Sequence, residues 1–156
     1  TAAGCKAFLN KDFTHEPAPS IDGGAWIAGK APEHEWKIVT FFAPDSERRR
    51  LYARLLQRAE DELDHRHRSP AALYWVAASA RGMDDVERAW GAAVAGWIRA
   101  AEIGPASVRL RDDLDRLVTQ AIVPERARLM TPVGDWHPMQ RVLQLQWEAL
   151  KRTWEK

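Results

Sequence analysis

The sequence predicts an all-α fold of about five helices, preceded by an irregular N-terminal arm. Over most of the chain after residue 44, apolar residues recur at intervals of three and four, which is the period of an amphipathic helix. Residues that start and stop helices bracket these stretches. The chain has 156 residues, 46% of them hydrophobic, so we expect one domain with a sizeable core.

The N-terminal part of the chain shows no sustained period. Its stretch HEPAPSIDGGAWIAGKAPEHE is rich in proline, glycine and charge, which is typical of loops. One segment, EWKIVTFFAP at 35–44, has the β-branched and aromatic content of a strand and ends at a proline. We therefore divide the chain into an extended or loop-rich arm, 1–44, and a helical domain, 45–156.

Two predicted helices follow the arm. Residues 47–67 place apolar side chains on one stripe, which consists of Tyr52, Leu55, Leu56, Ala59 and Leu63. The second helix starts with Ser69 as its cap and Pro70 in its first turn, and it runs to about Arg81. We expect its inner face to consist of Leu73, Val76, Ala77 and Ala80.

Three further helices are predicted. The third starts at Asp84 or Asp85 and ends at the Gly-Pro pair 104–105. The fourth carries a stripe of Leu110, Leu114, Leu117, Val118 and Ala121. Pro124 is expected to break the chain after it, because proline removes a helical hydrogen bond.

The last helix begins near Pro138 and is amphipathic. Its apolar stripe consists of Leu143, Trp147, Leu150 and Trp154. A stripe this apolar is not stable in water, so we expect the helix to pack against the preceding helices of the same molecule. Trp147 should be the more buried indole, because Trp154 lies near the terminus, where helices fray.

The third helix has two contrasting faces. One stripe is large and consists of Trp90, Val94, Trp97 and Ala101; the adjacent stripe is small and consists of Ala89, Ala93, Gly96 and Ala100. Small residues let a neighbouring helix approach closely. We therefore interpret the two tryptophans as packing residues beside a close helix contact.

Residues 70–105 resemble a tetratricopeptide-type helix pair, with RGMDDVERAW at the position of that family's turn. Ala77, Ala89 and Gly96 align with its small positions. The family's Trp, Tyr and Phe positions are occupied by Leu73, Ala80 and Ala93. The resemblance implies stacked antiparallel helical hairpins and a protein that binds a partner rather than converting a substrate.

A second segment, WKIVTFFAPDSERRR, is similar to the first strand and helix of thioredoxin-like proteins. Ser46 and Arg49 occupy the positions of the two cysteines, so dithiol exchange is excluded. This similarity leaves a cysteine-less thioredoxin-like protein as an alternative. The helical spacing of apolar residues after residue 69 disfavours that fold.

Metal and catalytic signatures are weak in this sequence. Glu62 and His65 have the Glu-x-x-His spacing of di-iron bundles, but a second pair on a facing helix is not visible. A charged helix end explains the pair more simply. The sequence predicts no metal, no cofactor and no catalytic site.

The net charge and the single cysteine limit the classes of partner that the sequence allows. A net charge of +1, with acidic neighbours beside most basic residues, argues against a nucleic-acid partner, and no apolar run reaches the ~18 residues of a membrane span. Cys5 in TAAGC follows small residues, as at the cleavage site of a bacterial lipoprotein, which makes it a lipidation candidate. This interpretation places the protein in the bacterial periplasm or cell envelope; otherwise it is cytoplasmic.

The leading functional hypothesis is a non-enzymatic helical protein-interaction module, with an oligomeric state that the sequence does not specify. Its interaction candidates are four aromatic residues interpreted as not needed for the core, namely Trp26, Trp36, Tyr74 and Trp75. The alternatives are a helical bundle that binds a small molecule or metal in a tryptophan-lined pocket, and an enzyme accessory subunit.

Overall fold

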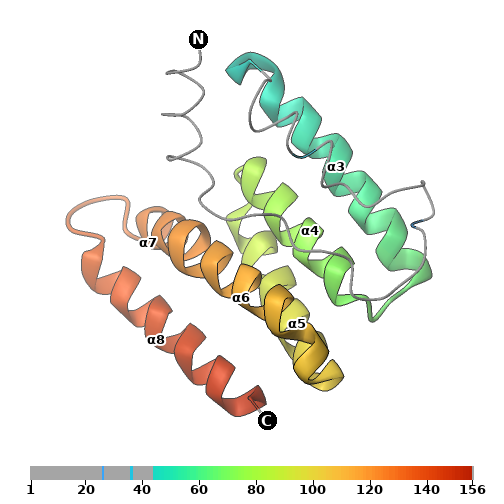
Figure 1. The fold of residues 1–156 in the computed structure, drawn as a ribbon. Helices are drawn as coiled ribbons and strands as arrows, with labels where there is room; N and C mark the ends of the chain where they lie inside the picture. The colour runs from blue at the N-terminus through green and yellow to red at the C-terminus, as the bar shows by residue number, and fades with distance from the viewer. Residues whose placement is uncertain (1–25, 27–35, 37–43, 156) are drawn as a thin grey trace, which may run out of the picture.

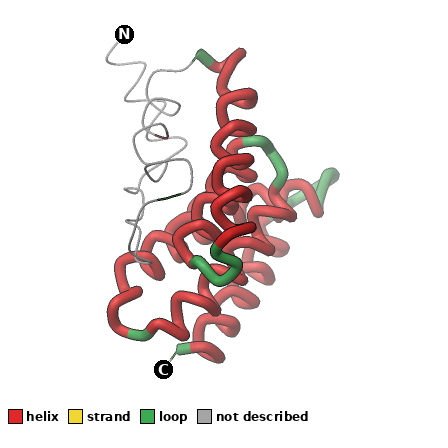
Figure 2. Tube along the Cα trace, turned by 90° about the vertical axis from the view of Figure 1, so that its right-hand side faces the viewer, coloured by secondary structure: helices red, strands yellow, loops and turns green. Residues whose placement is uncertain are grey.

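The computed structural model describes Trp26, Trp36 and residues 44–155, and the latter form an all-α domain (Figure 1). The helices are α3 (Asp45–His65), α4 (Pro70–Gly82), α5 (Val86–Ile103), α6 (Val108–Leu117), α7 (Val123–Met130) and α8 (His137–Trp154). Short loops join them (Figure 2). Residues 44–155 contain no strand, which confirms the all-α prediction. None of these helices is long and apolar enough to cross a membrane.

The strand expected at 35–44 falls outside the described residues except at its ends. Trp36 is helical, and Pro44 directly precedes α3. A thioredoxin-like fold requires further strands after residue 69, where the structure is helical. That alternative is therefore wrong.

Helix capping follows the sequence closely at α4 and α5. The Ser69 hydroxyl accepts a hydrogen bond of 3.0 Å from the Ala72 amide at the start of α4. At the start of α5, the Asp85 carboxylate accepts from the Arg88 amide at 3.4 Å. Gly104 ends α5 with a positive φ of 87°, a conformation that glycine adopts without steric cost.

Helix α4 is the centre of the domain and lies between α3 on one side and α5 and α6 on the other (Figure 1). All its residues from Pro70 to Ala80 are buried. A helix that is apolar on every side is stable only when neighbours cover its whole circumference. The predicted inner face was therefore too narrow, because the outer side of α4 is also covered.

Pro124 does not break the chain, contrary to expectation. Helix α6 continues through a π-helical turn, η2 (Val118–Ile122), directly into α7. In this turn the Val123 amide donates to the Val118 carbonyl five residues earlier. A proline removes one helical donor and its ring collides with the carbonyl four residues back, and a single wider turn relieves both problems without ending the helix.

The small face of α5 packs closely against two helices. Ala89, Ala93 and Ala100 have no exposed surface. A Cβ atom placed on Gly96 would lie 3.4 Å from the Leu73 Cβ of α4 and 3.5 Å from a methyl of Leu114 on α6. The predicted close helix contact is confirmed.

We expect Gly96→Leu to destabilise the fold by roughly 1–3 kcal/mol, because the added side chain has no room between α4 and α6. The measurement is the free energy of unfolding in urea, followed by circular dichroism. An unchanged midpoint would show that α4 and α6 separate easily at this position.

Gly82 offers a sharper steric test. A Cβ at this position would lie 2.5 Å from the Cγ atom of the Tyr52 ring, and that ring is only 2% exposed. We expect Gly82→Ala to cost roughly 1–3 kcal/mol through overpacking of α3 against α4. Gly91→Ala is the matched control: no atom lies within 4 Å of its Cβ position, so the alanine should stabilise α5 by about 0.5–1 kcal/mol. Equal effects from the two variants would contradict this packing.

Helix α8 completes the core from the side of α5. The Trp147 ring meets Trp97 edge-on with centroids 5.5 Å apart, and Trp90 at 6.2 Å. Trp147 has no exposed surface, whereas Trp154 is partly buried. Both the docking of α8 within the molecule and the order of burial are confirmed. The tryptophans of α5 are packing residues for α8.

Candidate interaction surface

The four aromatic interaction candidates lie in the core. Trp26 and Trp36 are 4% and 2% exposed, and Tyr74 and Trp75 are fully buried. The Trp36 ring lies 5.2 Å from Tyr52 and 5.4 Å from Trp75. The interpretation that these residues are not needed for the core is wrong, because all four are buried in the core cluster and Trp36 packs on Trp75 of α4. Cys5, the lipidation candidate, lies outside the described residues.

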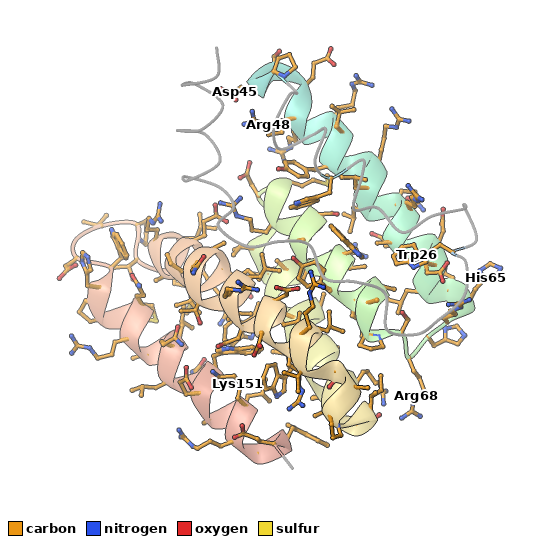
Figure 3. All side chains as sticks on the ribbon, in the orientation of Figure 1. Trp26, Asp45, Arg48, His65, Arg68 and Lys151 are labelled. Atoms are coloured by element: carbon orange, nitrogen blue, oxygen red, sulfur yellow. The ribbon has the colours of Figure 1, made fainter. Side chains whose placement is uncertain are left out.

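The Glu-x-x-His pair diverges. Glu62 is 2% exposed and pairs with Arg66, whereas His65 is exposed at the end of α3 (Figure 3). A ring nitrogen of His65 lies 3.2 Å from the Asp61 carbonyl oxygen. Within the described part of the chain, no three potential ligands gather for a metal ion.

Asp113 is an unusual carboxylate, because its side chain is only 1% exposed and pairs with Arg116 on the next turn of α6. Its Oδ2 atom has no hydrogen-bond partner among the described residues. Burial raises the pKa of the Asp113 carboxyl, and the Arg116 guanidinium only partly opposes this rise. Burial, together with the charge of Asp113, also raises the pKa of Tyr74. Solutes do not reach these groups, so they belong to the core rather than to a reaction site.

The raised pKa of Asp113 predicts a pH dependence. The native carboxyl holds its proton at a pH where the unfolded one has lost it, so its contribution to stability falls as pH rises above its ordinary value. Asp113→Asn removes this contribution. We therefore expect the free energy of unfolding of the variant to improve relative to the wild type between pH ~4 and pH ~7. A difference that stays constant over this range in urea unfolding would contradict the assignment.

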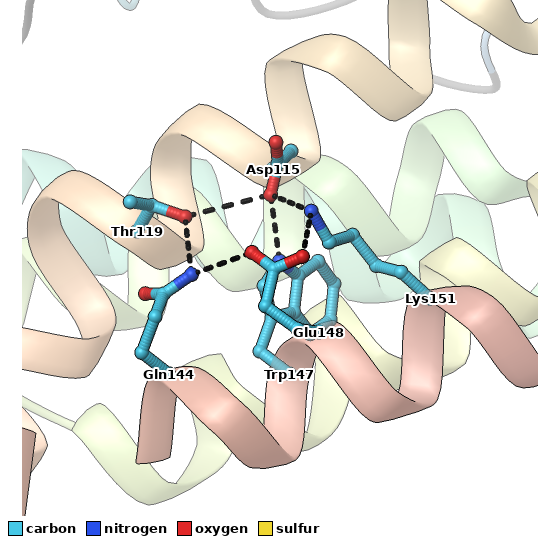
Figure 4. A network of polar contacts seen from close by, with 6 residues as sticks. All are labelled: Asp115, Thr119, Gln144, Trp147, Glu148 and Lys151. Carbon is cyan, nitrogen blue, oxygen red and sulfur yellow. Dashed lines mark hydrogen bonds and ion pairs between the residues drawn. The ribbon is translucent and has the colours of Figure 1, made fainter. Parts of the chain in front are cut away.

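A polar network fixes α8 on α6 (Figure 4). The Trp147 indole Nε1–H donates to Asp115 Oδ1 at 2.8 Å, and Lys151 Nζ donates to the same oxygen at 2.9 Å. Lys151 also pairs with Glu148 at 3.0 Å. Burial disfavours the charged ammonium, but the hydrogen bonds to Asp115 and Glu148 outweigh it and raise the pKa of Lys151.

A second link lies two turns earlier on α8. The Gln144 amide donates to the Glu148 carboxylate at 2.9 Å and to the Thr119 hydroxyl at 3.3 Å (Figure 4). The Trp147 indole, which donates to Asp115, is itself buried. These contacts fix both the position of α8 and its rotation about its own axis. Its opposite side therefore faces away from the domain.

The outward side of α8 carries an apolar stripe that we call the outer seam. Its apolar members, spaced by four and three, are Pro138, Val142, Leu145 and Ala149, and Arg152 continues the same spacing at the end of the helix. Val142 is 47% exposed and Leu145 is 61% exposed. A hollow of 330 Å³ adjoins the seam and is lined by His137, Gln140, Arg141, Gln144 and Leu145. This is an apolar surface on a rigidly held helix.

The end of α7 and the turn before α8 are also apolar at their surface. Leu129 is 63% exposed, Met130 is 46% exposed and Val133 is 88% exposed. Trp136 in this turn stacks on His137 with ring centroids 4.2 Å apart, and the Arg128 guanidinium lies 5.0 Å from the Trp136 centroid. The exposed apolar side chains of the described domain are thus concentrated at α7, α8 and the turn between them, with Ile103 and Val108 elsewhere.

Exposed arginines without an ion pair among the described residues include two at the outer seam and, on α3, Arg54. Arginines on α3, α5 and α7 are mostly paired with carboxylates, as in Arg49–Asp84, Arg88–Glu60 and Arg126–Glu87. Among the described residues, Arg141 and Arg152 have no ion pair, although both are exposed on α8. The outer seam therefore has two positive charges beside its apolar residues, neither of which is paired with a carboxylate of the described residues.

Sequence reasoning missed the outer seam, although it identified the inward stripe of α8. The signal was a second run of apolar residues at three- and four-residue spacing, Val142, Leu145 and Ala149, which stand one or two positions before members of the inward stripe. Searches against protein families, curated proteins and solved structures give no match to this chain.

Proposed function

We propose that this protein is a non-enzymatic interaction module that binds a protein partner through the outer seam of α8. The observation that carries the proposal is the exposure of Leu145 and Val142 on a helix whose opposite face is locked into the core. Clustered exposed apolar side chains with a polar rim mark interaction sites in many soluble proteins. A rigid helix presents such residues with little loss of conformational entropy on binding.

A pocket lined by tryptophans is the less supported alternative. Trp97 and Trp147 pack against each other and are nearly or fully buried, which argues that their rings serve the core. Stacked hairpins like those of tetratricopeptide proteins, and a lipid anchor at Cys5, stay predictions. An anchored module of this kind would hold its partner at the cell envelope.

Site-specific photo-crosslinking tests the proposal. A photoreactive phenylalanine analogue replaces Leu145 in the full chain, expressed in its native cells, and adducts are resolved by mass and identified. The matched control places the same analogue at Gln57, which is exposed on α3. We expect a discrete protein adduct at position 145 and none at position 57. The absence of an adduct at 145, or the same adducts at both positions, would contradict the proposed function.

A further inference from the structure

We propose that the partner docks on the outer seam with an amphipathic α-helix whose apolar stripe is flanked by Asp and Glu. This inference rests on the proposed function and names the chemical class of its partner. Its support comes from the width of the seam and from the charges around it.

The width of the seam fits a helix. Val142, Leu145 and Ala149 form a single row, and the exposed residue beside them, Gln146, is polar. Such a narrow row, with apolar residues spaced by three and four, is the geometry of a coiled-coil contact. From Pro138 to Arg152 the row extends over about 20 Å, because an α-helix rises 1.5 Å per residue. It therefore matches about four turns of a partner helix.

The charges of α8 favour an acidic partner. Arg141 directly precedes Val142, Arg152 follows Ala149 by three residues, and neither has an ion pair among the described residues. The nearest acid on α8, Glu148, already binds Gln144 and Lys151 with its two oxygens. Carboxylates that flank a partner's apolar stripe would neutralise both arginines, and a basic partner would be repelled.

A membrane surface fits less well. Helices that lie in a membrane interface present a broad apolar face with aromatic residues on it. On α8, Trp147 points into the core and Trp154 is partly buried, while Gln146 and Thr153 are exposed on the outer side. A second copy of the chain also fits less well, because it would bring its own unneutralised arginines to the seam.

The test uses two synthetic helical peptides of about 21 residues, a length that spans the seam with a turn to spare at each end. Both carry the same Leu and Ala stripe, with Glu in one and Lys in the other at the flanking positions. Binding to the full chain is measured by isothermal titration calorimetry at low and high salt. We expect the acidic peptide to bind at least about tenfold more tightly, with a preference that shrinks at high salt.

Variants of the chain locate the contact. Leu145→Asp should weaken binding of the acidic peptide at least about tenfold, because it places charge in the seam. Arg141→Glu combined with Arg152→Glu should reverse the preference toward the basic peptide. The matched controls are Ile103→Asp, at an exposed apolar side chain beside the α3–α4 turn, and Arg54→Glu, at an exposed arginine on α3. Both controls should leave the affinity unchanged.

Several results would overturn this inference. They are failure of the acidic peptide to bind at ~1 mM, equal affinity of the two peptides, or binding that Leu145→Asp does not weaken. Leu145-dependent binding to anionic phosphatidylglycerol vesicles without peptide binding would identify a membrane instead, and a Leu145-dependent dimer in sedimentation would identify a second copy. A protein adduct at position 145 with no acidic preference rejects only the partner class, whereas no adduct rejects the proposed function.

Discussion

Trp147→Ala is expected to lower the free energy of unfolding by about 3–5 kcal/mol. The indole is fully buried between α8 and the two tryptophans of α5, so truncation leaves a cavity where Trp97 lies 5.5 Å away. It also removes the hydrogen bond of 2.8 Å to Asp115. Urea unfolding followed by circular dichroism measures the effect.

Trp154→Ala is the matched control for this prediction. The same substitution at the last residue of α8 removes a side chain that is only partly buried, so it should cost clearly less. If Trp147→Ala left stability unchanged, or if both variants lost the same amount, α8 would not be fixed by its inner face.

Trp36→Ala is expected to have a similar cost, about 3–5 kcal/mol. Its ring is 2% exposed and packs on Tyr52 of α3 and Trp75 of α4 at centroid distances of 5.2 and 5.4 Å. Loss of the indole uncovers the outer side of the central helix. The measurement is again the urea midpoint, with the free energy extrapolated to water.

Trp136→Ala provides the comparison for the arm tryptophan. Trp136 lies in the turn before α8 and is partly buried, so its loss should cost less than the loss of Trp36. An unchanged midpoint for Trp36→Ala would show that Trp36 contributes nothing to the core, and would make it a candidate for partner binding again.

The start of α4 could be predicted because its determinants are local. The Ser69 cap and Pro70 act within one turn of their own positions, so the sequence alone indicates the boundary. The full burial of Tyr74 and Trp75 could not be predicted in the same way. It depends on residues that are distant along the chain: the Trp36 ring packs against Trp75 with centroids 5.4 Å apart, and the charge of Asp113 on α6 acts on Tyr74.

The effect of Pro124 could be predicted only in part. Proline does disturb the hydrogen bonds of the helix around it, but the chain absorbs the disturbance in the π-helical turn of η2 and keeps its direction. No sequence pattern in this segment distinguishes a wider turn from a break. Beyond the turn, α7 packs against α8.

The outer seam could not be predicted from the sequence for a different reason. On α8, the stripe with Leu143 and Trp147 and the seam with Val142 and Leu145 both satisfy a helical period. The larger volume of the tryptophans favours the first for the core, and the structure agrees. The ion pairs of the folded surface decide which arginines stay unpaired beside exposed apolar residues. These ion pairs cannot be predicted from residue spacing along the chain.

A nuclear magnetic resonance titration of the isotope-labelled chain with the acidic peptide tests the central claim, that α8 binds a partner with its outer side while its inner side stays in the core. We expect amide shifts at Val142, Leu145 and Ala149 and in the turn before α8. The indole Nε1–H signal of Trp147 should not move, because its bond to Asp115 persists. Shifts centred on α3 or α4, or a displaced Trp147 signal that reports release of α8, would contradict the account.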